Sequence, residues 1–384
     1  MKFIPKDITV IAFSFALLSF YTNEWQSQNL FFESGFGGSV EILQYEINGN
    51  FNPNVADVVG SDLGYDWVTD LDDLPEIGNF RIFYEVGDTL KSKASIVNDP
   101  LNASNKVMLF ELMEPNVEYT SSNGQTHFKG RVQAAFHNND TLREFRNFRK
   151  LYIHPDFAHL STTPLPIVWL TISEYWNNST AEADFPFRVT LNIRKEAGVG
   201  ASLHFGAHAQ YLDPITDSWV DVWDTVNLTD TIPLGEWITL EDYFFEGDEN
   251  TGVYMAKITF DDGSFYEIVN SENFTHHPDD PLPNGVNSFN PMKLYTSGGL
   301  VDGMIDHCLC IYWDDYQLEI PGSPESTCLS DFDNDGIVGV SDGLILLAEF
   351  GCVSTLCSTD TNGDGAVTIA DALTYLSEYG SSCI

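Results

Sequence analysis

Histidine, arginine, lysine and amide side chains recur at every second position in three short segments of this chain. The first segment, 126–137, carries His127, Lys129, Arg131, Gln133 and His137 in this pattern. The other two, 187–194 and 201–211, carry Arg188, Asn192, Arg194, His204, His208 and Gln210. Mostly apolar residues fill the positions between them. A period of two indicates strands with one face in a core and the other in solvent.

These side chains suit proton transfer and the binding of an anion. Imidazoles can move protons, and guanidinium and amide groups donate hydrogen bonds to a carboxylate. If the three segments share one sheet, its open face could serve glycan binding and proton transfer. The alternative is that these are the ordinary solvated faces of antiparallel strands. The opposite series of the first segment is predicted to face a core: Phe128, Gly130, Val132, Ala134 and Phe136.

The net charge argues against one class of partner. With 57 acidic and 17 basic residues, the chain has a formal net charge of −40 and should repel nucleic acid. Six basic residues nevertheless fall in the segment 129–150, with only two acidic ones. They are Lys129, Arg131, Arg143, Arg146, Arg149 and Lys150. Such a patch would concentrate an anionic ligand, unless these cations only neutralise neighbouring carboxylates.

The N-terminal residues 1–22 have the pattern of a secretory signal peptide. Lys2 and Lys6 precede an apolar run from Ile8 to Phe20, which is short for a membrane span. We therefore expect a secreted or cell-surface protein with no membrane segment in its mature form. A membrane anchor is the alternative.

Residues 28–320 are predicted to form one mainly β domain. Short alternating or apolar runs are separated by Gly, Pro, Asn and Asp, which is typical of an all-β sandwich. The segment 141–152 fits either a strand or one face of a helix. The runs FFESGF near the start and IYWDDYQLEI at the end resemble the first and last strands of concanavalin-A-like jelly rolls. That resemblance implies a two-sheet sandwich with a sugar-binding cleft on one sheet.

After a linker at 321–327, residues 328–384 contain two twelve-residue loops with the spacing of calcium ligands. Oxygen ligands at alternate positions, with Gly at position 6, wrap one Ca²⁺ in each loop. The expected ligands are Asp331, Asp333, Asp335, Ile337 and Asp342 in the first loop, and Asp360, Asn362, Asp364, Ala366 and Asp371 in the second. Each loop leads into a short helix that ends at Gly.

The two loops, 29 residues apart, resemble type I dockerin repeats. The resemblance implies a small α-helical, calcium-binding domain with two Ca²⁺ sites and a cohesin-like or cell-surface partner. Gly339 at position 9 of the first loop and the flanking cysteines depart from the family pattern. These departures favour a calcium-stabilised tail or anchor over cohesin binding.

Six cysteines in a secreted chain predict disulfides. The symmetric arrangement is one bond in each repeat, Cys328 with Cys352 and Cys357 with Cys383, although spacing does not fix connectivity. Cys308 and Cys310 either pair elsewhere or remain free.

Three segments are similar to the catalytic strands of alginate-lyase-type jelly-roll polysaccharide lyases. They are LREFR (142–146), HAQ (208–210) and MKLY (292–295), although the order of His and Gln is reversed and Lys and Tyr lie closer together. The resemblance implies β-elimination on a uronate-containing polysaccharide. Arg131 and Gln133 would bind the uronate carboxylate, His137 or His208 would take the proton, and Tyr295 would be the general acid. The residues expected to bind substrate are Lys129, Arg143, Arg146, Arg188, Arg194, His204, Gln210 and Lys293.

Two other functions are compatible with the same fold. A glycoside hydrolase needs two carboxylates across the scissile bond, and none lies on the three polar strand faces. A non-catalytic carbohydrate-binding protein would instead depend on aromatic platforms such as Trp169, Trp176 or Trp223.

Overall fold

The computed structural model describes residues 28–47, 50–71, 78–84, 91–120, 124–178, 184–213, 215–216, 218–321, 329–333, 338–353, 357–361 and 365–380. The expected signal peptide at 1–22 lies outside the described residues, as does nearly all of the expected linker at 321–327. No helix among the described residues is long and apolar enough to cross a membrane.

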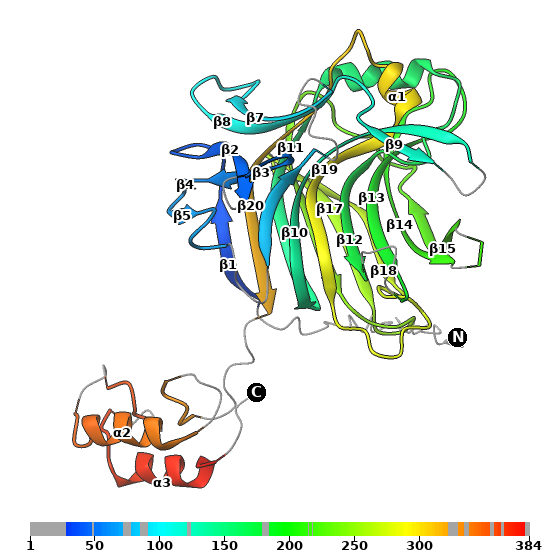
Figure 1. The fold of residues 1–384 in the computed structure, drawn as a ribbon. Helices are drawn as coiled ribbons and strands as arrows, with labels where there is room; N and C mark the ends of the chain where they lie inside the picture. The colour runs from blue at the N-terminus through cyan, green and yellow to red at the C-terminus, as the bar shows by residue number, and fades with distance from the viewer. Residues whose placement is uncertain are drawn as a thin grey trace, which may run out of the picture.

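The chain is mainly β, and its strands form two large antiparallel sheets (Figure 1). We call them sheet 1 and sheet 2. Sheet 1 has the order β18 (Phe265–Glu272), β17 (Val253–Phe260), β16 (Trp237–Phe245), β11 (Glu144–Ile153), β20 (Leu309–Pro321), β8 (Lys106–Leu112) and β7 (Ser92–Asn98), with β1 (Gln28–Ser34) also paired to β20.

Sheet 2 contains the three segments in which polar residues recur at every second position. Its order is β15 (Ser218–Val226), β14 (Leu203–Asp213), β13 (Phe187–Lys195), β12 (Thr171–Asn177), β19 (Val286–Ser297), β10 (Thr126–Leu142), β6 (Asn79–Phe83), β3 (Asn50–Val59) and β2 (Glu41–Ile47), with β9 (Val117–Thr120) paired to β10. The remaining elements are the pair β4 (Ser61–Asp62) and β5 (Tyr65–Asp66), the 3₁₀ helix η1 (Pro155–Thr162) and the helices α1 (Gly298–Asp302), α2 (Val340–Glu349) and α3 (Ile369–Glu378).

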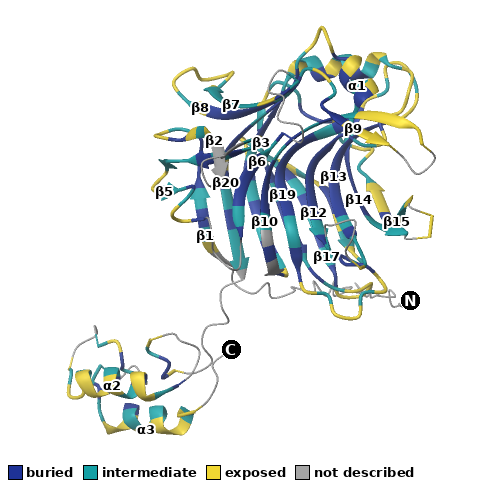
Figure 2. Ribbon diagram, in the orientation of Figure 1, coloured by how far each residue is buried: buried dark blue, intermediate teal, exposed yellow. Residues whose placement is uncertain are grey.

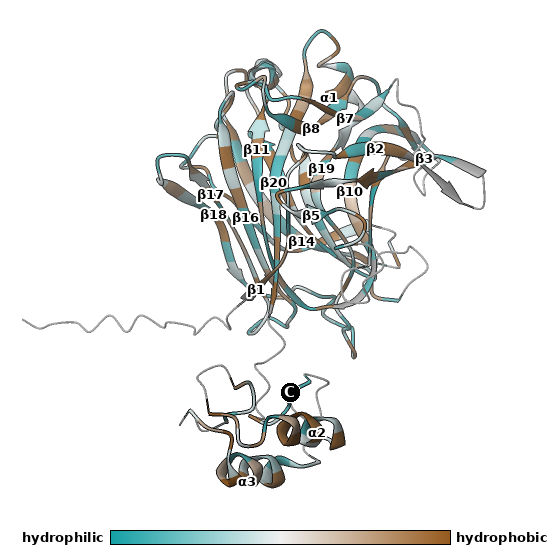
Figure 3. Ribbon diagram, turned by 90° about the vertical axis from the view of Figure 1, so that its left-hand side faces the viewer, coloured by the Kyte–Doolittle hydropathy of each residue, from teal (hydrophilic) through white to brown (hydrophobic). Residues whose placement is uncertain are grey.

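The core lies between the two sheets and is rich in aromatic rings. Trp67 stacks on Phe80, Phe80 contacts Phe136, and Phe136 stacks on Phe289 at centroid distances of 4.5 to 4.8 Å. These side chains are buried, and buried segments, in dark blue, lie along many of the strands in Figure 2. Hydrophilic and hydrophobic stretches alternate along the strands of both sheets in Figure 3. Large rings that interlock in this way account for much of the apolar burial in a sandwich.

A buried polar network also joins the sheets. Arg149 on β11 forms an ion pair with Asp242 on β16, and both side chains are fully buried. Asp242 also accepts hydrogen bonds from the hydroxyls of Tyr175 and Tyr254, at 2.7 and 2.8 Å. Arg149 donates to Ser173 on β12 of sheet 2. Because each buried charge has partners, its desolvation is compensated.

The ambiguous segment 141–152 is extended and not helical. It forms the end of β10 and most of β11, which pairs with both β16 and β20. Phe145, Asn147 and Arg149 face the core, and the residues between them face outward. The polar–apolar pattern could not decide this, because cross-strand hydrogen bonds from distant residues determine the conformation.

The predicted core face of 126–137 is confirmed in part. Gly130, Val132, Ala134 and Phe136 are buried, but Phe128 is 54% exposed. Phe128 lies where β10 pairs only with the short strand β9, beyond the covered part of the sheet. Its exposure corrects the prediction for that residue.

The C-terminal helices α2 and α3 follow the two predicted calcium loops, as expected. Each has an Asp at its third position, Asp342 or Asp371, whose carboxylate accepts a hydrogen bond from the backbone N–H of Gly339 or Thr368. In α3 the side chain of Thr368 completes a capping box. The glycines after the helices, Gly351 and Gly380, adopt positive φ angles of 87° and 82°, the left-handed conformation that commonly ends a helix.

The disulfides differ from the symmetric arrangement. Cys352 is bonded to Cys357, so each of these cysteines pairs with the neighbouring repeat and not within its own. The proposed partners, Cys328 and Cys383, lie outside the described residues. Cys308 is bonded to Cys310 at the start of β20. Spacing alone did not reveal either bond.

Candidate functional site

The three chemically suggestive segments form β10, β13 and β14, and all three strands belong to sheet 2. Two further strands, β12 and β19, lie between β10 and β13 and complete the surface. The register places Arg131 opposite Tyr295 and Gln133 opposite Lys293, and it places Arg188 opposite Gln210, Thr190 opposite His208 and Arg194 opposite His204. We call this side of sheet 2 the polar face.

Tyr295 on β19 lies among three cations of the polar face. Its ring centroid is 4.9 Å from Lys293 Nζ, 5.6 Å from Lys129 Nζ and 5.5 Å from Arg131 Cζ. Trp169 packs against the ring, at a centroid distance of 4.9 Å. Positive charges this close stabilise negative charge on a ligand beside the ring. The surroundings of Tyr295 therefore attract an anion in a strongly acidic protein.

Two adjoining cavities open on the polar face. The first, of about 350 Å³, is lined by residues that include Tyr295, Trp169, Arg194 and His208. The second, of about 260 Å³, is lined by residues that include Arg131, Tyr119 and Glu174. Both cavities are bordered by Lys129, Arg188, Trp219 and Tyr295. Together they form a charged and aromatic cleft, which we call the polar cleft.

Glu174 on β12 is the main residue that the sequence did not reveal. It is 2% exposed and forms ion pairs with Lys293 and Arg188. Although burial alone would raise the pKa of Glu174, Lys293 and Arg188 lower it to about 2. Burial lowers the pKa of Lys293 to about 8, against the opposing effect of Glu174. Glu174 is thus a fixed negative charge that holds two cations of the cleft.

Glu174 escaped notice because β12 does not alternate cleanly between polar and apolar residues. Six of the seven residues of TISEYWN are buried, so the strand shows no polar face in its sequence. In addition, the pairing of β12 with both neighbours shifts between Thr171 and Glu174. A shift of this kind changes which residues share a face.

Arg188 is held on the other side by an amide and an indole. Its guanidinium donates to Gln210 Oε1 from Nε and Nη2, at 3.1 and 2.8 Å. It also lies 3.9 Å from the ring centroid of Trp219. Gln210 in turn donates to Asp221, at 2.7 Å. Arg188 is therefore a rigid cation between Glu174 and the aromatic wall of the cleft.

His208 is fixed as a neutral ring. Arg194 Nη2 lies 2.8 Å from His208 Nδ1, and the same nitrogen of Arg194 lies 2.9 Å from Asp224 Oδ1. Because a guanidinium only donates hydrogen bonds, Nδ1 must be the acceptor and Nε2 must carry the proton. Burial, with Arg194 and Arg188 nearby, lowers the pKa of His208 to about 3. His208 is therefore a hydrogen-bond donor toward the cleft, which does not suit the expected role of base.

The backbones of His208 and Tyr295 lie on opposite sides of the larger cavity. Strands β12 and β13 separate β19 from β14, so the two backbones are three strand spacings apart, about 14 Å. Their side chains reach inward from both sides, since both line the same cavity. The space between them is suitable for a sugar ring.

Several predicted site residues lie away from Tyr295. His137 is six residues from Arg131 along β10, about 20 Å, and its ring packs against Phe83. Gln133 lies on the polar face beside Lys293 but does not border either cavity. His204 contacts the carbonyl oxygen of Asp230 through Nδ1, at 2.8 Å, and borders a different pocket.

Arg143 and Arg146 are not part of the polar face, which corrects their predicted role as substrate-binding residues of this cleft. Arg146 is on β11 of sheet 1, where its side chain lies 3.6 Å from Glu241. Arg143 follows the end of β10 and lies 3.5 Å from Glu246. The basic segment 129–150 passes from one sheet to the other, so its cations do not form a single patch.

The described part of the first calcium loop has ligands suited to a hard cation. The carboxylates of Asp331, Asp333 and Asp342 each offer an oxygen within 4.8 Å of the others. Oxygen clusters of this kind fit Ca²⁺. In the second loop, Asp371 accepts hydrogen bonds from the backbone N–H groups of Thr361 and Thr368, at 2.9 and 2.7 Å. The expected ligands Asp335, Ile337, Asn362 and Asp364 lie outside the described residues.

No protein-family model matches the chain, and no curated protein sequence matches it. Among solved structures, the chain is similar to an endo-β-1,4-glucuronan lyase from the fungus Trichoderma reesei, with 15% identity, a TM-score of 0.36 and coverage of 59% of this chain and 86% of that one. It is also similar to a PL-14 alginate lyase from Aplysia kurodai, with 9% identity, a TM-score of 0.39 and coverage of 62% and 89%.

A third similar structure is the exoplasmic or lumenal domain of VIP36 in a Ca²⁺/Man-bound form, with 10% identity, a TM-score of 0.31 and coverage of 62% and 84%. With TM-scores below 0.4, the reaction must be argued from the side chains of this chain. The architecture itself is plain: a mainly β protein whose two antiparallel sheets pack as a sandwich, with a charged cleft on one of them.

Proposed function

We propose that this protein is a secreted polysaccharide lyase of jelly-roll fold that cleaves an anionic, uronate-containing polysaccharide by β-elimination. The observation that carries the proposal is the group of three cations, Lys129, Arg131 and Lys293, within 5.6 Å of the ring of Tyr295. β-Elimination next to a carboxylate needs cations to neutralise the acid and a proton-transfer group beside them. The polar cleft has both at one place.

In this mechanism, Arg131 and Lys129 bind the uronate carboxylate and stabilise the charge that builds up when C5 loses its proton. Gln133, two residues further along β10 and opposite Lys293, borders neither cavity and has no role in this mechanism. Arg188, fixed by Glu174 and Gln210, binds a neighbouring acidic residue of the polymer. These cations are held before substrate arrives, so little reorganisation is needed during the reaction.

Tyr295 carries the proton. In its deprotonated form it takes the C5 proton, and the C–H electron pair forms the C4–C5 double bond. The C4–O4 bond breaks, and the resulting phenol returns the proton to the leaving O4. No net proton is consumed, so Tyr295 ends in its starting state. His208 donates a hydrogen bond from Nε2 to the sugar ring that lies between His208 and Tyr295.

A hydrolase with the same cleft is less well supported. A glycosidase needs a protonated carboxylic acid as its general acid. The pKa of Glu174 is lowered to about 2, so this carboxyl is ionised at any working pH. Asp221 and Asp224, the carboxylates of the larger cavity, are engaged with Gln210 and Arg194. Glu118 is the further carboxylate that borders the smaller cavity.

The binding-protein alternative depends on exposed aromatic platforms. Trp223 does not provide one, because it is 9% exposed and donates to the carbonyl oxygen of Phe274. Trp169 borders the larger cavity, and Trp176 borders the smaller one. A sugar could stack on either, so binding without cleavage is the outcome that would favour this alternative.

The test is the formation of unsaturated uronates, followed by ultraviolet absorbance, with alginate, glucuronan, ulvan and pectate as substrates. Tyr295→Phe is expected to lower kcat by a factor of about 10²–10⁴. Tyr266→Phe, in which a hydroxyl of sheet 1 is removed, is the matched control and should retain activity. Binding of these polymers without absorbance change in the wild type would reject the lyase in favour of a binding protein.

We further propose that residues 328–384 form a dockerin-like domain that binds two Ca²⁺ ions, after the domain at 28–320 and a linker at 321–327. The three clustered carboxylates of the first loop and the two capped helices support this. A signal peptide at 1–22 would direct the chain to secretion. The tail would attach the protein to a cohesin-like or cell-surface partner, which pull-down with and without calcium can test.

A further inference from the structure

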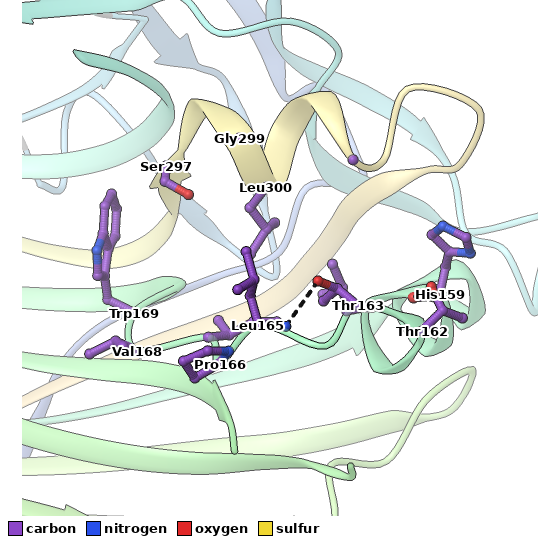
Figure 4. Close-up of a pocket in the computed structure, with 13 residues that line it drawn as sticks. His159, Thr162, Thr163, Leu165, Pro166, Val168, Trp169, Ser297, Gly299 and Leu300 are labelled. Atoms are coloured by element: carbon purple, nitrogen blue, oxygen red, sulfur yellow. Dashed lines mark hydrogen bonds between the residues drawn. The ribbon is translucent and has the colours of Figure 1, made fainter. Parts of the chain in front are cut away.

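A second, less polar cavity lies beside the polar cleft. It has a volume of about 330 Å³ and lies between the segment 159–169 and the N-terminal part of α1 (Figure 4). Figure 4 shows Trp169 at one end and His159 at the other, with Leu165 and Leu300 between them. Among the described residues that line it, none is Lys, Arg, Asp or Glu. This cavity, which we call the neutral pocket, therefore does not suit a charged group.

The walls of the neutral pocket are held in place by bonds that are independent of any ligand. The buried ammonium of Lys195 donates to the carbonyl oxygens of Thr163, Glu196 and Gly198, at 2.9, 3.0 and 3.1 Å. Ile167 and Lys195 exchange backbone hydrogen bonds. On the other side, Thr296 Oγ1 donates to the carbonyl oxygen of Trp169, at 3.1 Å. A preformed pocket binds without a large ordering cost.

The neutral pocket adjoins the polar cleft. Val168 and Trp169 line both, so the two spaces share one wall. Ser297 of the neutral pocket is two residues beyond Tyr295 on β19, about 7 Å along the strand. That separation is comparable to one sugar residue of a polymer. A chain with a uronate at Tyr295 would therefore place its next sugar at the neutral pocket.

We propose that the neutral pocket binds a 6-deoxyhexose residue directly adjacent to the uronate. The C-methyl group of such a sugar would pack against Leu165, Leu300 and Trp169. Its ring hydroxyls would meet the side chains of Thr163 and Ser297. Thr163 Oγ1 already accepts a hydrogen bond from the backbone of Leu165, at 3.3 Å, so its own proton is available to donate. That this sugar is next to a uronate in a polymer rests on the proposed lyase function, whereas the binding of the single sugar does not.

The sugar site can be tested without catalysis. Saturation-transfer NMR with the full-length protein would compare methyl α-L-fucopyranoside with methyl α-L-galactopyranoside, and methyl α-L-rhamnopyranoside with methyl α-L-mannopyranoside. Within each pair, only the 6-hydroxyl differs. At least one 6-deoxy sugar is expected to bind about 10-fold more tightly than its parent, the lower range for a methyl-sized contact in an apolar pocket. Equal binding within both pairs would overturn the proposal.

Leu165→Asp supplies the matched variant. Leu165 is 69% exposed, so the change places a charge at the neutral pocket without disturbing the core. Binding of the 6-deoxy sugar should fall at least 10-fold, whereas Leu101→Asp, at a similarly exposed leucine outside the pocket, should not affect it. Unchanged binding in Leu165→Asp would refute the assignment of the site.

Polymer cleavage separates this inference from the proposed function. For wild type, KM should be lower on a polymer that alternates glucuronate with rhamnose than on glucuronan, and Leu165→Asp should raise KM on the alternating polymer. Cleavage of both polymers with equal KM would reject the neutral pocket as a subsite and leave the lyase intact. Sugar binding without any cleavage would retain the pocket and reject the lyase.

Discussion

Neutralising Glu174 should reveal how the polar cleft keeps its cations charged. At neutral pH, the lowered pKa of Glu174, about 2 against an ordinary value of 4.5, corresponds to about 3 kcal/mol of stabilisation. The lowered pKa of Lys293, about 8 against 10.5, corresponds to a cost of about 3 kcal/mol. The two effects nearly cancel, so the pair adds little net stability. Glu174→Gln removes the stabilisation from Glu174 and increases the cost of keeping Lys293 charged, so it is expected to destabilise the fold by at least about 3 kcal/mol at pH 7.

The pH dependence gives a sharper signature. Because Glu174 raises the pKa of Lys293, the variant should lower it below the wild-type value of about 8. Between the folded pKa and 10.5, the unfolded chain binds a proton that the folded protein has lost, so stability rises with pH. In the wild type this rise begins near pH 8. In Glu174→Gln it begins lower and adds about 1.4 kcal/mol per pH unit below pH 8.

Urea unfolding followed by tryptophan fluorescence, from pH 6 to 9, measures both quantities. The double variant Glu174→Gln/Lys293→Met removes both buried charges. Its unfolding free energy should therefore not rise with pH below pH 8 as that of Glu174→Gln does, and it should recover much of the stability that Glu174→Gln loses. Parallel stability curves for the wild type and Glu174→Gln between pH 6 and 8 would refute this account of the pair.

Three further predictions follow from particular contacts. Asp242→Asn leaves Arg149 buried without its carboxylate and should cost about 3–5 kcal/mol of unfolding free energy. Glu241→Gln, on the outer side of the same strand, should cost less than about 1 kcal/mol. Equal losses in urea titrations would contradict this. Because the pKa of His208 is lowered to about 3, wild-type stability should fall as pH decreases from 6.5 towards 3. His208→Gln should make that fall less steep in acid titrations. An unchanged profile would argue against a neutral buried ring. Chelation should lower the melting temperature of the C-terminal helices by circular dichroism, and Asp342→Asn should weaken calcium binding in calorimetry at least 10-fold; no response to either would reject the calcium site.

Much of the local structure could be predicted from the sequence. The period of two in the segments 187–194 and 201–211 is sufficient to define β13 and β14, because alternation is a property of neighbouring residues. The helices α2 and α3 follow the two loops and end before a glycine, as the sequence predicts. The calcium ligands stay a prediction from the spacing within each loop.

The composition of the polar cleft could be predicted only in part. Residue type and alternation predicted Arg131 and His208, the resemblance of MKLY to a lyase strand implied Tyr295, and all three border the polar cleft. Glu174 was not, because β12 is buried on both faces and shows no polar pattern. The role of His208 also could not be foreseen, since it depends on the hydrogen bond from Arg194 on the neighbouring strand.

The sequence by itself determined where strands and helices form, and which side of most strands is polar. Only the tertiary structure decided which of those polar sides lie together. It placed Arg146 and Arg149 on sheet 1 while Arg131 remained on sheet 2, and it brought Glu174 to Lys293 across 119 residues of chain. The physical reason is that periodicity and capping are encoded by adjacent residues, whereas strand neighbours, bulges and buried ion pairs are selected by contacts between distant ones.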